Sequence, residues 1–506
     1  MATFDNLLLG FSVAFQPDML LYAFLGCLVG TLVGILPGIG PLAGISILLP
    51  VTYGLDATKA IVMLAGIYYG SQYGGSTTSI LMRIPGEAAS VMTCIDGYAM
   101  AQKGRAGAAL CIAAVGSFIA GTFGVVMLTV VAPPLANLAL SFGPPEYTAL
   151  LTLGLIFLAY MSSTSLVRTL LMASFGLLLG MIGIDVMTGH FRYSFDIPEL
   201  GDGIGIVPVA VGLFGLGEIL STPSSTVTQK VVPPRLIELL PNREEWRQSA
   251  MPIARGSVLG FLVGIVPGSA HIISSFLSYA LEKRVSKTPE EFGRGAVAGV
   301  AGPESANNSA STGAFVPMLA LGLPTGPVTA VLMAALLING VAPGPALVNE
   351  HPQVFWGFIA SMYVGNLMLL ALNLPLVGLF VSVLRIPYAY LYPLIIMFCI
   401  IGVYEVSHSV VDVWIMLIMG IVGYGLRKFG FDPAPLVLGL VIAPIFEMSL
   451  RQSLIMSNGN WTIFFYRPIA ATLMAVCAGL LLLALLSVIR RRRDWRNRLA
   501  EVEEGK

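Results

Sequence analysis

Two short stretches of the sequence gather hydroxyl and amide side chains in otherwise apolar surroundings. The first contains Ser71, Ser76, Thr77, Thr78 and Ser79, and the second contains Ser305, Asn307, Asn308, Ser309, Ser311 and Thr312. These residue types are preferred at helix N-termini, where free backbone N–H groups and the positive end of the helix dipole attract an anion. The two clusters therefore predict two helix starts that bind an anion between them. The alternative is structural, because small polar side chains also let membrane helices pack closely.

A break in the apolar pattern precedes each polar cluster. The breaks are Pro37-Gly38-Ile39-Gly40-Pro41 and Pro267-Gly268-Ser269. Proline removes a helix hydrogen bond, and glycine allows close approach of another backbone. Hydrocarbon tolerates the resulting unpaired backbone groups only where they line a cavity or lie buried in protein. We therefore expect both breaks to contribute to a binding site, with a simple packing kink as the alternative.

A turn sequence follows each polar cluster after roughly ten residues, which is too short for a membrane span of about 20 residues. The turns are Ile84-Pro85-Gly86 and Leu323-Pro324-Thr325-Gly326-Pro327. Because proline and glycine at these positions end a helix, the spacing predicts a re-entrant hairpin in each half of the chain.

Four ionisable residues near these segments are candidate sites, since charges are expensive within a membrane. Arg83, at the first turn, could pair with a substrate carboxylate or reach the membrane interface. Asp96 is a candidate for cation or proton coupling, or an ordinary loop residue near Lys103. Glu304 directly precedes the second cluster and could hold a cation or cap a helix. Glu87 is expected to complement a helix dipole.

The composition identifies the class of protein that carries these features. Of 506 residues, 56% are hydrophobic and 11% are charged, whereas soluble domains carry about 25% charged residues. Such a chain cannot cover a water-exposed surface, so we interpret it as a polytopic, all-α membrane protein. A net charge of zero argues against nucleic-acid binding. The five cysteines lie singly in apolar segments and do not suggest a metal site.

The two halves of the chain resemble each other. Gly30-x-x-x-Gly34-Ile-Leu-Pro37-Gly38 recurs as Gly260-x-x-x-Gly264-Ile-Val-Pro267-Gly268, an offset of 230 residues. The turn prolines Pro85 and Pro324 differ by 239 residues, and Glu218 and Glu447 differ by 229. Three landmarks in the same order favour duplication over chance recurrence of Gly and Pro. Glu218 and Glu447 suit an interhelical structural bond at least as well as a functional role.

Basic residues predict the orientation of the repeats, because positively charged loops stay cytoplasmic. They collect between the halves and again at Arg490 to Arg493, so both halves should cross the membrane an odd number of times, as inverted repeats. Lys283 and Arg284 fit this topology only if 256–281 enters the membrane and returns, bent at Pro267-Gly268. The predicted divisions are a first membrane repeat (1–220), a cytoplasmic linker (221–255), a second membrane repeat (256–465), a final transmembrane helix (466–490) and a cytoplasmic tail (491–506).

Three segments resemble the large permease subunit of the tripartite tricarboxylate transporters, the TctA family. They are GILPGIGP from Gly34 to Pro41, the stretch from Gly66 to Leu110, and the stretch from Pro267 to Pro327. The similarity extends over nearly the whole chain. It implies a multi-pass protein of the bacterial inner membrane that imports citrate-like di- or tricarboxylates. Its partners would be a small membrane subunit and a periplasmic substrate-binding protein, besides the membrane lipid.

The resemblance also implies transport driven by a cation gradient, with sodium as the expected ion and no cofactor or further metal. The expected substrate ligands are Ser76, Thr77, Thr78, Asn307, Asn308 and Ser309, with Arg83 at the turn. The expected cation ligands are backbone carbonyls of Gly38, Ile39, Gly40, Gly268 and Ser269, as half-helix ends provide in other inverted-repeat carriers. An elevator-like movement of the hairpins is expected to give alternating access.

Two functions from other classes remain open at this stage. An intramembrane hydrolase could use Ser76 with a histidine, although neither cluster contains one and His271 is the nearest to a break. A passive organic-anion channel is also conceivable, because broken helices and polar helix ends occur in channels. The sequence predicts that the protein is a carrier and not an enzyme.

Overall fold

The computed structural model describes residues 2–36, 39–161, 165–185, 187–221, 239–268, 270–379 and 388–483. Within these ranges the chain is almost entirely helical, which confirms the predicted all-α class. The first half contains α1 (Ala2–Ala14), α2 (Pro17–Ile35), α3 (Gly40–Leu48), η1 (Pro50–Thr52), α4 (Ala57–Met82), η2 (Ala88–Ser90), α5 (Val91–Gln102), α6 (Ala106–Ala139), α7 (Pro144–Met161), α8 (Leu166–Leu179), the strands β1 (Gly183–Ile184) and β2 (Phe191–Arg192), η3 (Pro198–Leu200), α9 (Ile206–Ala210), the π-helical turn η4 (Val211–Leu216) and α10 (Gly217–Ser221).

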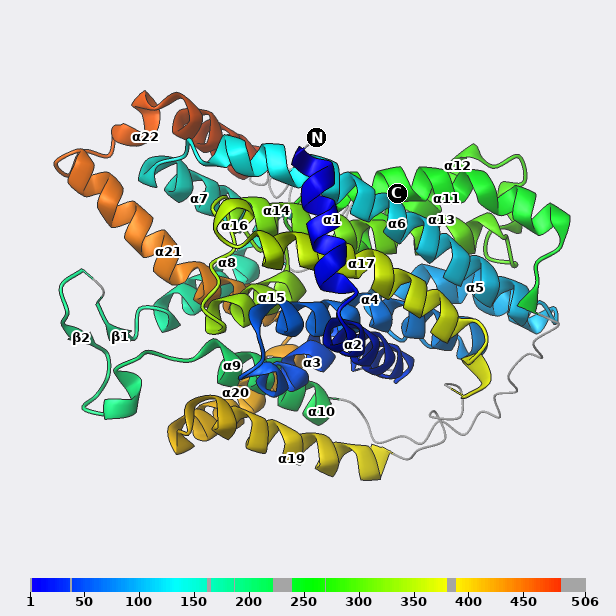
Figure 1. The fold of residues 1–506 in the computed structure, drawn as a ribbon, viewed down its shortest axis with the longest axis horizontal. Helices are drawn as coiled ribbons and strands as arrows, with labels where there is room; N and C mark the ends of the chain where they lie inside the picture. Colours follow the sequence, from blue (N-terminus) through cyan, green and yellow to red (C-terminus); the bar gives the residue numbers. More distant parts are fainter. Residues whose placement is uncertain are drawn as a thin grey trace, which may run out of the picture.

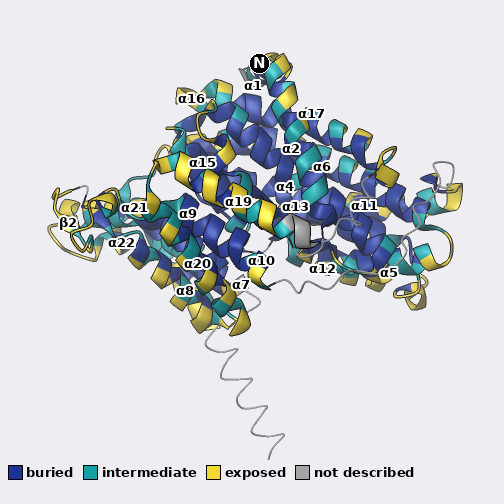
Figure 2. Ribbon diagram, turned by 90° about the horizontal axis from the view of Figure 1, so that it is seen from below, coloured by how far each residue is buried: buried dark blue, intermediate teal, exposed yellow. Residues whose placement is uncertain are grey.

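The second half is also built mainly of helices. It contains α11 (Arg243–Gly264), α12 (Ala270–Val285), η6 (Pro289–Glu291), α13 (Ala298–Gly313), α14 (Phe315–Leu321), α15 (Pro327–Ile338), α16 (Leu347–Glu350), α17 (Pro352–Asn373), α19 (Tyr388–Ser407), α20 (Val410–Lys428), α21 (Ala434–Met456) and α22 (Ile463–Tyr466), followed by an apolar helix at Pro468–Leu483. Five helices in the described ranges are long and apolar enough to span a membrane: α2, α6, α17, α20 and α21. Buried residues fill the central helices, and exposed residues gather at the ends of the molecule (Figure 2).

Glycine stripes bring the central helices into backbone contact. On α2, a Cβ added to Gly26, Gly30 or Gly34 would collide with the carbonyl oxygens of α4 at Met63, Ile67 and Ser71. On α11, a Cβ at Gly256, Gly260 or Gly264 would collide with the carbonyl oxygens of α13 at Gly302, Ala306 and Ala310. Each glycine of α11 lies 230 residues after its counterpart in α2, and each contacted carbonyl of α13 lies 239 residues after its counterpart in α4. The two helix pairs therefore pack in the same register. This repeated register supports the predicted duplication.

The turns after α4 and α14 also have the same construction in both halves. Arg83 and Gly322, which are 239 residues apart, end these helices in the left-handed conformation with φ of 59° and 68°. Four residues later, the Glu87 backbone N–H bonds to the Ser90 hydroxyl at 3.4 Å, and the Gly326 N–H bonds to its counterpart Thr329 at 2.9 Å. The same cap therefore starts the helical segment that follows each turn.

Helices α4 and α13 meet in the middle of the molecule (Figure 1), where α4 residues of rising number bond to α13 residues of falling number. Gln72 of α4 donates a hydrogen bond to the Ser311 hydroxyl of α13, and Ser76 donates to Glu304 at 2.6 Å. Gln72 and Ser311 are themselves 239 residues apart, so equivalent positions face each other. Two oppositely oriented repeats would also place matching positions opposite each other, and the inverted-repeat topology stays a prediction.

The predicted bend at Pro267-Gly268 is confirmed as a break between α11 and α12. Arg255 on α11 forms an ion pair with Glu282 on α12, with Nη2 and Oε2 2.5 Å apart, so the two helices fold back as a hairpin. Helix α11 already begins at Arg243, within the stretch predicted as a linker. Residues 222–238 of that linker and the predicted tail lie outside the described residues. The domain boundaries stay predictions.

Charged residues fasten the peripheral helices to one another. Glu218 on α10 pairs with Arg427 on α20 at 2.8 Å, and Glu447 on α21 pairs with Arg192 beside the β-hairpin at 2.7 Å. Glu218 therefore makes an interhelical bond, whereas Glu447 joins α21 to Arg192 of strand β2. Arg451 donates to Asp185 in the hairpin loop, and this contact lowers the pKa of that carboxyl well below its usual value. The Asp185–Arg451 pair thus stays charged at physiological pH.

We expect Gly260→Ala to destabilise the protein, although alanine normally stabilises a helix by about 1 kcal/mol relative to glycine. The new Cβ would meet the Ala306 carbonyl and push α11 away from α13. Overpacking of this kind costs about 1–3 kcal/mol. The measurement is the thermal unfolding midpoint of the purified protein in detergent.

The matched control is Gly154→Ala in α7, where an added Cβ has no heavy atom within 4 Å. This variant should unfold at the same temperature as the parent or slightly higher. Equal midpoints for both variants would contradict a backbone contact between α11 and α13.

Candidate functional site

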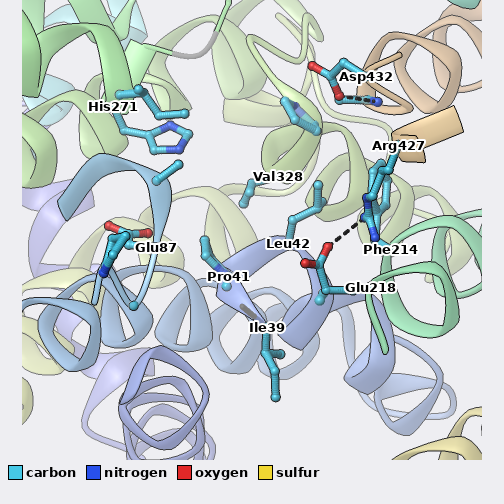
Figure 3. Close-up of a pocket in the computed structure, with 18 residues that line it drawn as sticks. Ile39, Pro41, Leu42, Glu87, Phe214, Glu218, His271, Val328, Arg427 and Asp432 are labelled. Atoms are coloured by element: carbon cyan, nitrogen blue, oxygen red, sulfur yellow. Dashed lines mark hydrogen bonds and ion pairs between the residues drawn. The ribbon is translucent and has the colours of Figure 1, made fainter. Parts of the chain in front are cut away.

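A cavity of about 380 Å³ lies between the broken helices of the two halves (Figure 3). One repeat contributes Ile39 to Ala43 and Pro85 to Ala88, and the other contributes His271, Ile272, Pro327 and Val328. Gly40, Pro41 and Leu42 correspond to residues 270 to 272 at the offset of 230 found for the glycine stripes. Segments at matching positions of the two halves therefore line one cavity.

Helix starts surround this cavity. Gly40 and Pro41 begin α3, Ala270 and His271 begin α12, Pro327 begins α15, and Glu87 and Ala88 lead into η2 and α5. The first N–H groups of a helix have no partner within the helix, and its dipole is positive at this end. The cavity wall thus carries backbone donors from both repeats, which favours binding of an anion.

The predicted helix starts at the polar clusters are wrong. Ser76, Thr77 and Thr78 lie inside α4, which begins at Ala57, and Asn307, Asn308 and Ser309 lie inside α13, which begins at Ala298. Hydroxyls in these clusters donate to the carbonyl four residues earlier, as Ser79 does to Gly75 at 2.9 Å and Thr312 to Asn308 at 3.2 Å. Such bonds give the side-chain hydroxyls an acceptor within the helix, so these residues can lie in a helix interior despite their preference for helix starts.

The two polar clusters nevertheless lie side by side where α4 contacts α13. Glu304 accepts from Ser76 and from Thr93 of α5. Asn308 donates to Ser117 of α6 at 2.7 Å. Thr78 and Ser309 donate to backbone carbonyls of the neighbouring glycine-stripe helices, at 2.9 Å and 2.7 Å. The clusters form a buried polar layer, and none of the predicted substrate ligands is among the residues that line the cavity.

Arg83 is exposed at the end of α4, with its guanidinium carbon 5.9 Å from the centre of the Tyr98 ring. Of the predicted cation ligands, Ile39 and Gly40 line the cavity. The Gly268 N–H donates to the Thr325 carbonyl at 2.6 Å, which ties the second break to the second turn. Gly38 and Ser269 lie outside the described residues. The ligand roles of all these residues stay predictions.

Asp96 is a structural anchor in this fold. Its Oδ1 accepts from the backbone N–H groups of Gly293, Gly295 and Ala296 at 2.7–2.9 Å. Its Oδ2 accepts from the Tyr279 hydroxyl at 2.9 Å. The side chain is fully buried. These four donors fix the segment that leads into α13, so coupling through Asp96 is not favoured.

Arg427 is the cavity residue that the sequence did not reveal. It ends α20 and pairs with Glu218, and its Nη2 also donates to the Leu213 carbonyl at 3.3 Å. Its Nη1 is buried and has no hydrogen-bond partner among the described residues. In the sequence, an arginine after an apolar run looks like an ordinary interface residue. Figure 3 shows it on the cavity wall beside Glu218, with Asp432 beyond it.

Comparison with known proteins identifies the group to which this cavity belongs. A model of the tripartite tricarboxylate transporter TctA family matches residues 20–438. The chain belongs to this family. Family members are the large membrane subunits of tripartite tricarboxylate transporters and are not enzymes, so the chain is a multi-pass inner-membrane transport protein. No solved structure matches the TctA-family chain.

Two relatives of the TctA-family chain come from Agrobacterium vitis. An uncharacterized 52.8 kDa protein in the TAR-I ttuC' 3' region is 48% identical over 490 residues, which cover 97% of this chain and 98% of the relative. An uncharacterized protein in the TAR-II ttuC' 3' region is 48% identical over 235 residues, which cover 46% of this chain and 97% of the relative. The first alignment shows that the similarity extends well beyond the cavity-lining motifs.

We expect Asp96→Ala to lower the stability of the protein because it removes the acceptor of three backbone N–H groups, of which that of Ala296 is buried. Each unsatisfied buried donor costs about 1–3 kcal/mol. The thermal unfolding midpoint in detergent should fall sharply, whereas Asp5→Ala, an exposed change in α1, should leave it unchanged. An Asp96→Ala protein that unfolds normally but has lost transport would instead make Asp96 a coupling residue.

Proposed function

We propose that this TctA-family subunit is a secondary active transporter that imports di- or tricarboxylate anions with a sodium gradient. The observation that carries the proposal is the cavity between the two halves, which is lined by the first residues of helices from both. Its volume of about 380 Å³ lies within the range of about 300–1,000 Å³ typical of small-molecule sites. Family membership supports the carboxylate class of the substrate.

The arrangement of donors suits a substrate with more than one carboxylate. The starts of α3 and α12 occupy equivalent places in the two halves, so an anion between them would meet donors on two sides. The unpartnered Nη1 of Arg427 supplies a further donor on the wall formed by α20. Hydrogen bonds from a guanidinium to a carboxylate are charge-assisted and stronger than neutral ones.

The charges of the cavity support coupling to a cation. Glu87, Glu218 and Asp432 line it together with a single guanidinium, that of Arg427. An anionic substrate that enters alone would be repelled by the excess of carboxylates. A cation that enters with the substrate offsets this repulsion, which is the basis of symport in our proposal. A small membrane subunit and a periplasmic substrate-binding protein complete the tripartite system that we propose for this chain.

The test is uptake of radiolabelled di- and tricarboxylates by proteoliposomes that contain the protein, with its binding protein and small subunit added. We expect saturable uptake when sodium is high outside, and no accumulation above equilibrium when sodium is equal on both sides. Uptake that only equilibrates the substrate under an imposed sodium gradient would instead identify a passive channel.

We expect Arg427→Gln to weaken substrate affinity by roughly 10- to 100-fold, since a hydrogen bond to a charged group contributes about 1.5–3 kcal/mol. Arg427→Lys should keep part of the affinity because the charge remains. The apparent affinity in the uptake assay is the measurement. Arg247→Gln, which changes an arginine 82% exposed on α11, is the control and should behave like the parent. Unchanged affinity in Arg427→Gln would remove Arg427 from the substrate site.

A further inference from the structure

Two buried carboxylates lie near each other, one in the cavity wall and one on α13. Glu87 is 5% exposed, and Glu304 on α13 is fully buried. They lie close enough to interact electrostatically. Among the described residues, neither carboxylate forms an ion pair. A buried charge without a counter-charge is strongly unfavourable, so this pair requires a positive species in its functional state.

The hydrogen bonds around the two carboxylates differ. Glu304 is held by the hydroxyls of Ser76 and Thr93. Both oxygens of Glu87 are buried and have no hydrogen-bond partner in the described chain. Glu87 is wedged against α4, because a Cβ added at Gly75 would lie 3.0 Å from its Cγ. Glu87 therefore presents a fixed and unsatisfied carboxylate, whereas Glu304 already has two donors.

Asn307 adds a second unsatisfied group at the same place. Its amide lies near Glu87, and both amide atoms are buried without a hydrogen-bond partner among the described residues. One turn along the α4–α13 contact, the amide oxygen of Gln72 is also unpartnered, while its nitrogen donates to Ser311. Native proteins leave few buried polar groups unpaired, and several together indicate a missing ion or ligand.

We propose that Glu87, Glu304 and Asn307 form a binding site for one sodium ion. The available ligands are carboxylate and amide oxygens, which hard cations prefer. Because two hydroxyls already stabilise the charge of Glu304, the main uncompensated charge is that of Glu87, which suits a monovalent ion. Gln72 can complete the site with its free amide oxygen. Within the described residues, no group of three or more His, Cys, Asp or Glu side chains that could hold a metal ion occurs, so the proposed site relies on two carboxylates together with amide oxygens.

The position of Glu87 links this ion to the cavity. Glu87 lines the cavity and also faces Asn307, and Figure 3 shows it across the cavity from the Glu218–Arg427 ion pair. An ion bound at Glu87 would cancel the carboxylate that an incoming anion meets. The equivalent position in the other repeat is Gly326, so the site occurs once. This role in coupling rests on the proposed function.

Sodium binding can be measured without substrate, on the purified full chain in detergent. The readout is the thermal unfolding midpoint as sodium chloride replaces choline chloride at constant ionic strength. We expect a saturable rise for the parent, since a ligand that binds the folded state stabilises it. Glu87→Gln and Glu304→Gln should each weaken the apparent sodium affinity at least tenfold. Glu290→Gln, an exposed change beside α12, is the control and should keep the parent response.

A second measurement separates loss of a ligand from misfolding. In sodium-free buffer, Glu87→Gln should unfold at the same or a higher temperature than the parent, because an uncompensated buried charge has been removed. A parent midpoint that is insensitive to sodium between pH 6 and 8 would overturn the site, as would a parent-like sodium response in both glutamine variants. A midpoint that depends on pH but not on sodium would show that the carboxylates take a proton, and this also overturns the sodium site.

These measurements distinguish failure of the sodium site from failure of the proposed transport function. If the parent binds sodium, both variants lose this binding, and a sodium gradient still does not drive uptake, the ion site stands and the proposed symport is wrong. If a sodium gradient drives uptake in both variants with the sodium dependence of the parent, the ion site is wrong and the symport stands.

Discussion

Backbone-to-backbone contact between glycine-bearing helices is the constraint on which the rest of this structure depends. Gly30 and Gly260 let α2 and α11 touch the carbonyls of α4 and α13, leaving no room for side chains between them. The remaining polar faces of α4 and α13 can then meet each other in the centre. In a membrane, where burial of apolar surface does not drive helix association, close packing and interhelical hydrogen bonds must hold this arrangement together.

The same packing decides where charge is tolerated. The breaks after α2 and α11 are held beside the turns after α4 and α14, so that helix starts face a common cavity. Glu87 lies in the wall of this cavity and interacts electrostatically with the buried Glu304. Groups that favour an anion therefore lie next to groups that favour a cation, because the helix starts carry positive partial charge and the carboxylates carry negative charge. In our proposal, each ligand makes the binding of the other more favourable.

Sequence reasoning recovered the features that depend on chain chemistry and missed those that depend on packing. Proline and glycine identified both breaks and both turns, because these residues restrict the backbone wherever they occur. The sequence predicts helix starts at the polar clusters. In the structure, however, the hydroxyls of Ser79 and Thr312 donate to backbone carbonyls of their own helices. The residue type alone does not distinguish these two arrangements. Asp96 and Arg427 acquire their roles from segments far away along the chain.

The hydrogen bond between Gln72 and Ser311 shows what a single polypeptide permits at matching places. These residues are 239 positions apart in the two halves, yet one offers an amide and the other a hydroxyl. Because both places belong to one chain, their side chains can differ, as Glu87 and Gly326 also do. Asymmetric chemistry within a symmetric frame is thus a capacity that a homodimer of this fold would lack.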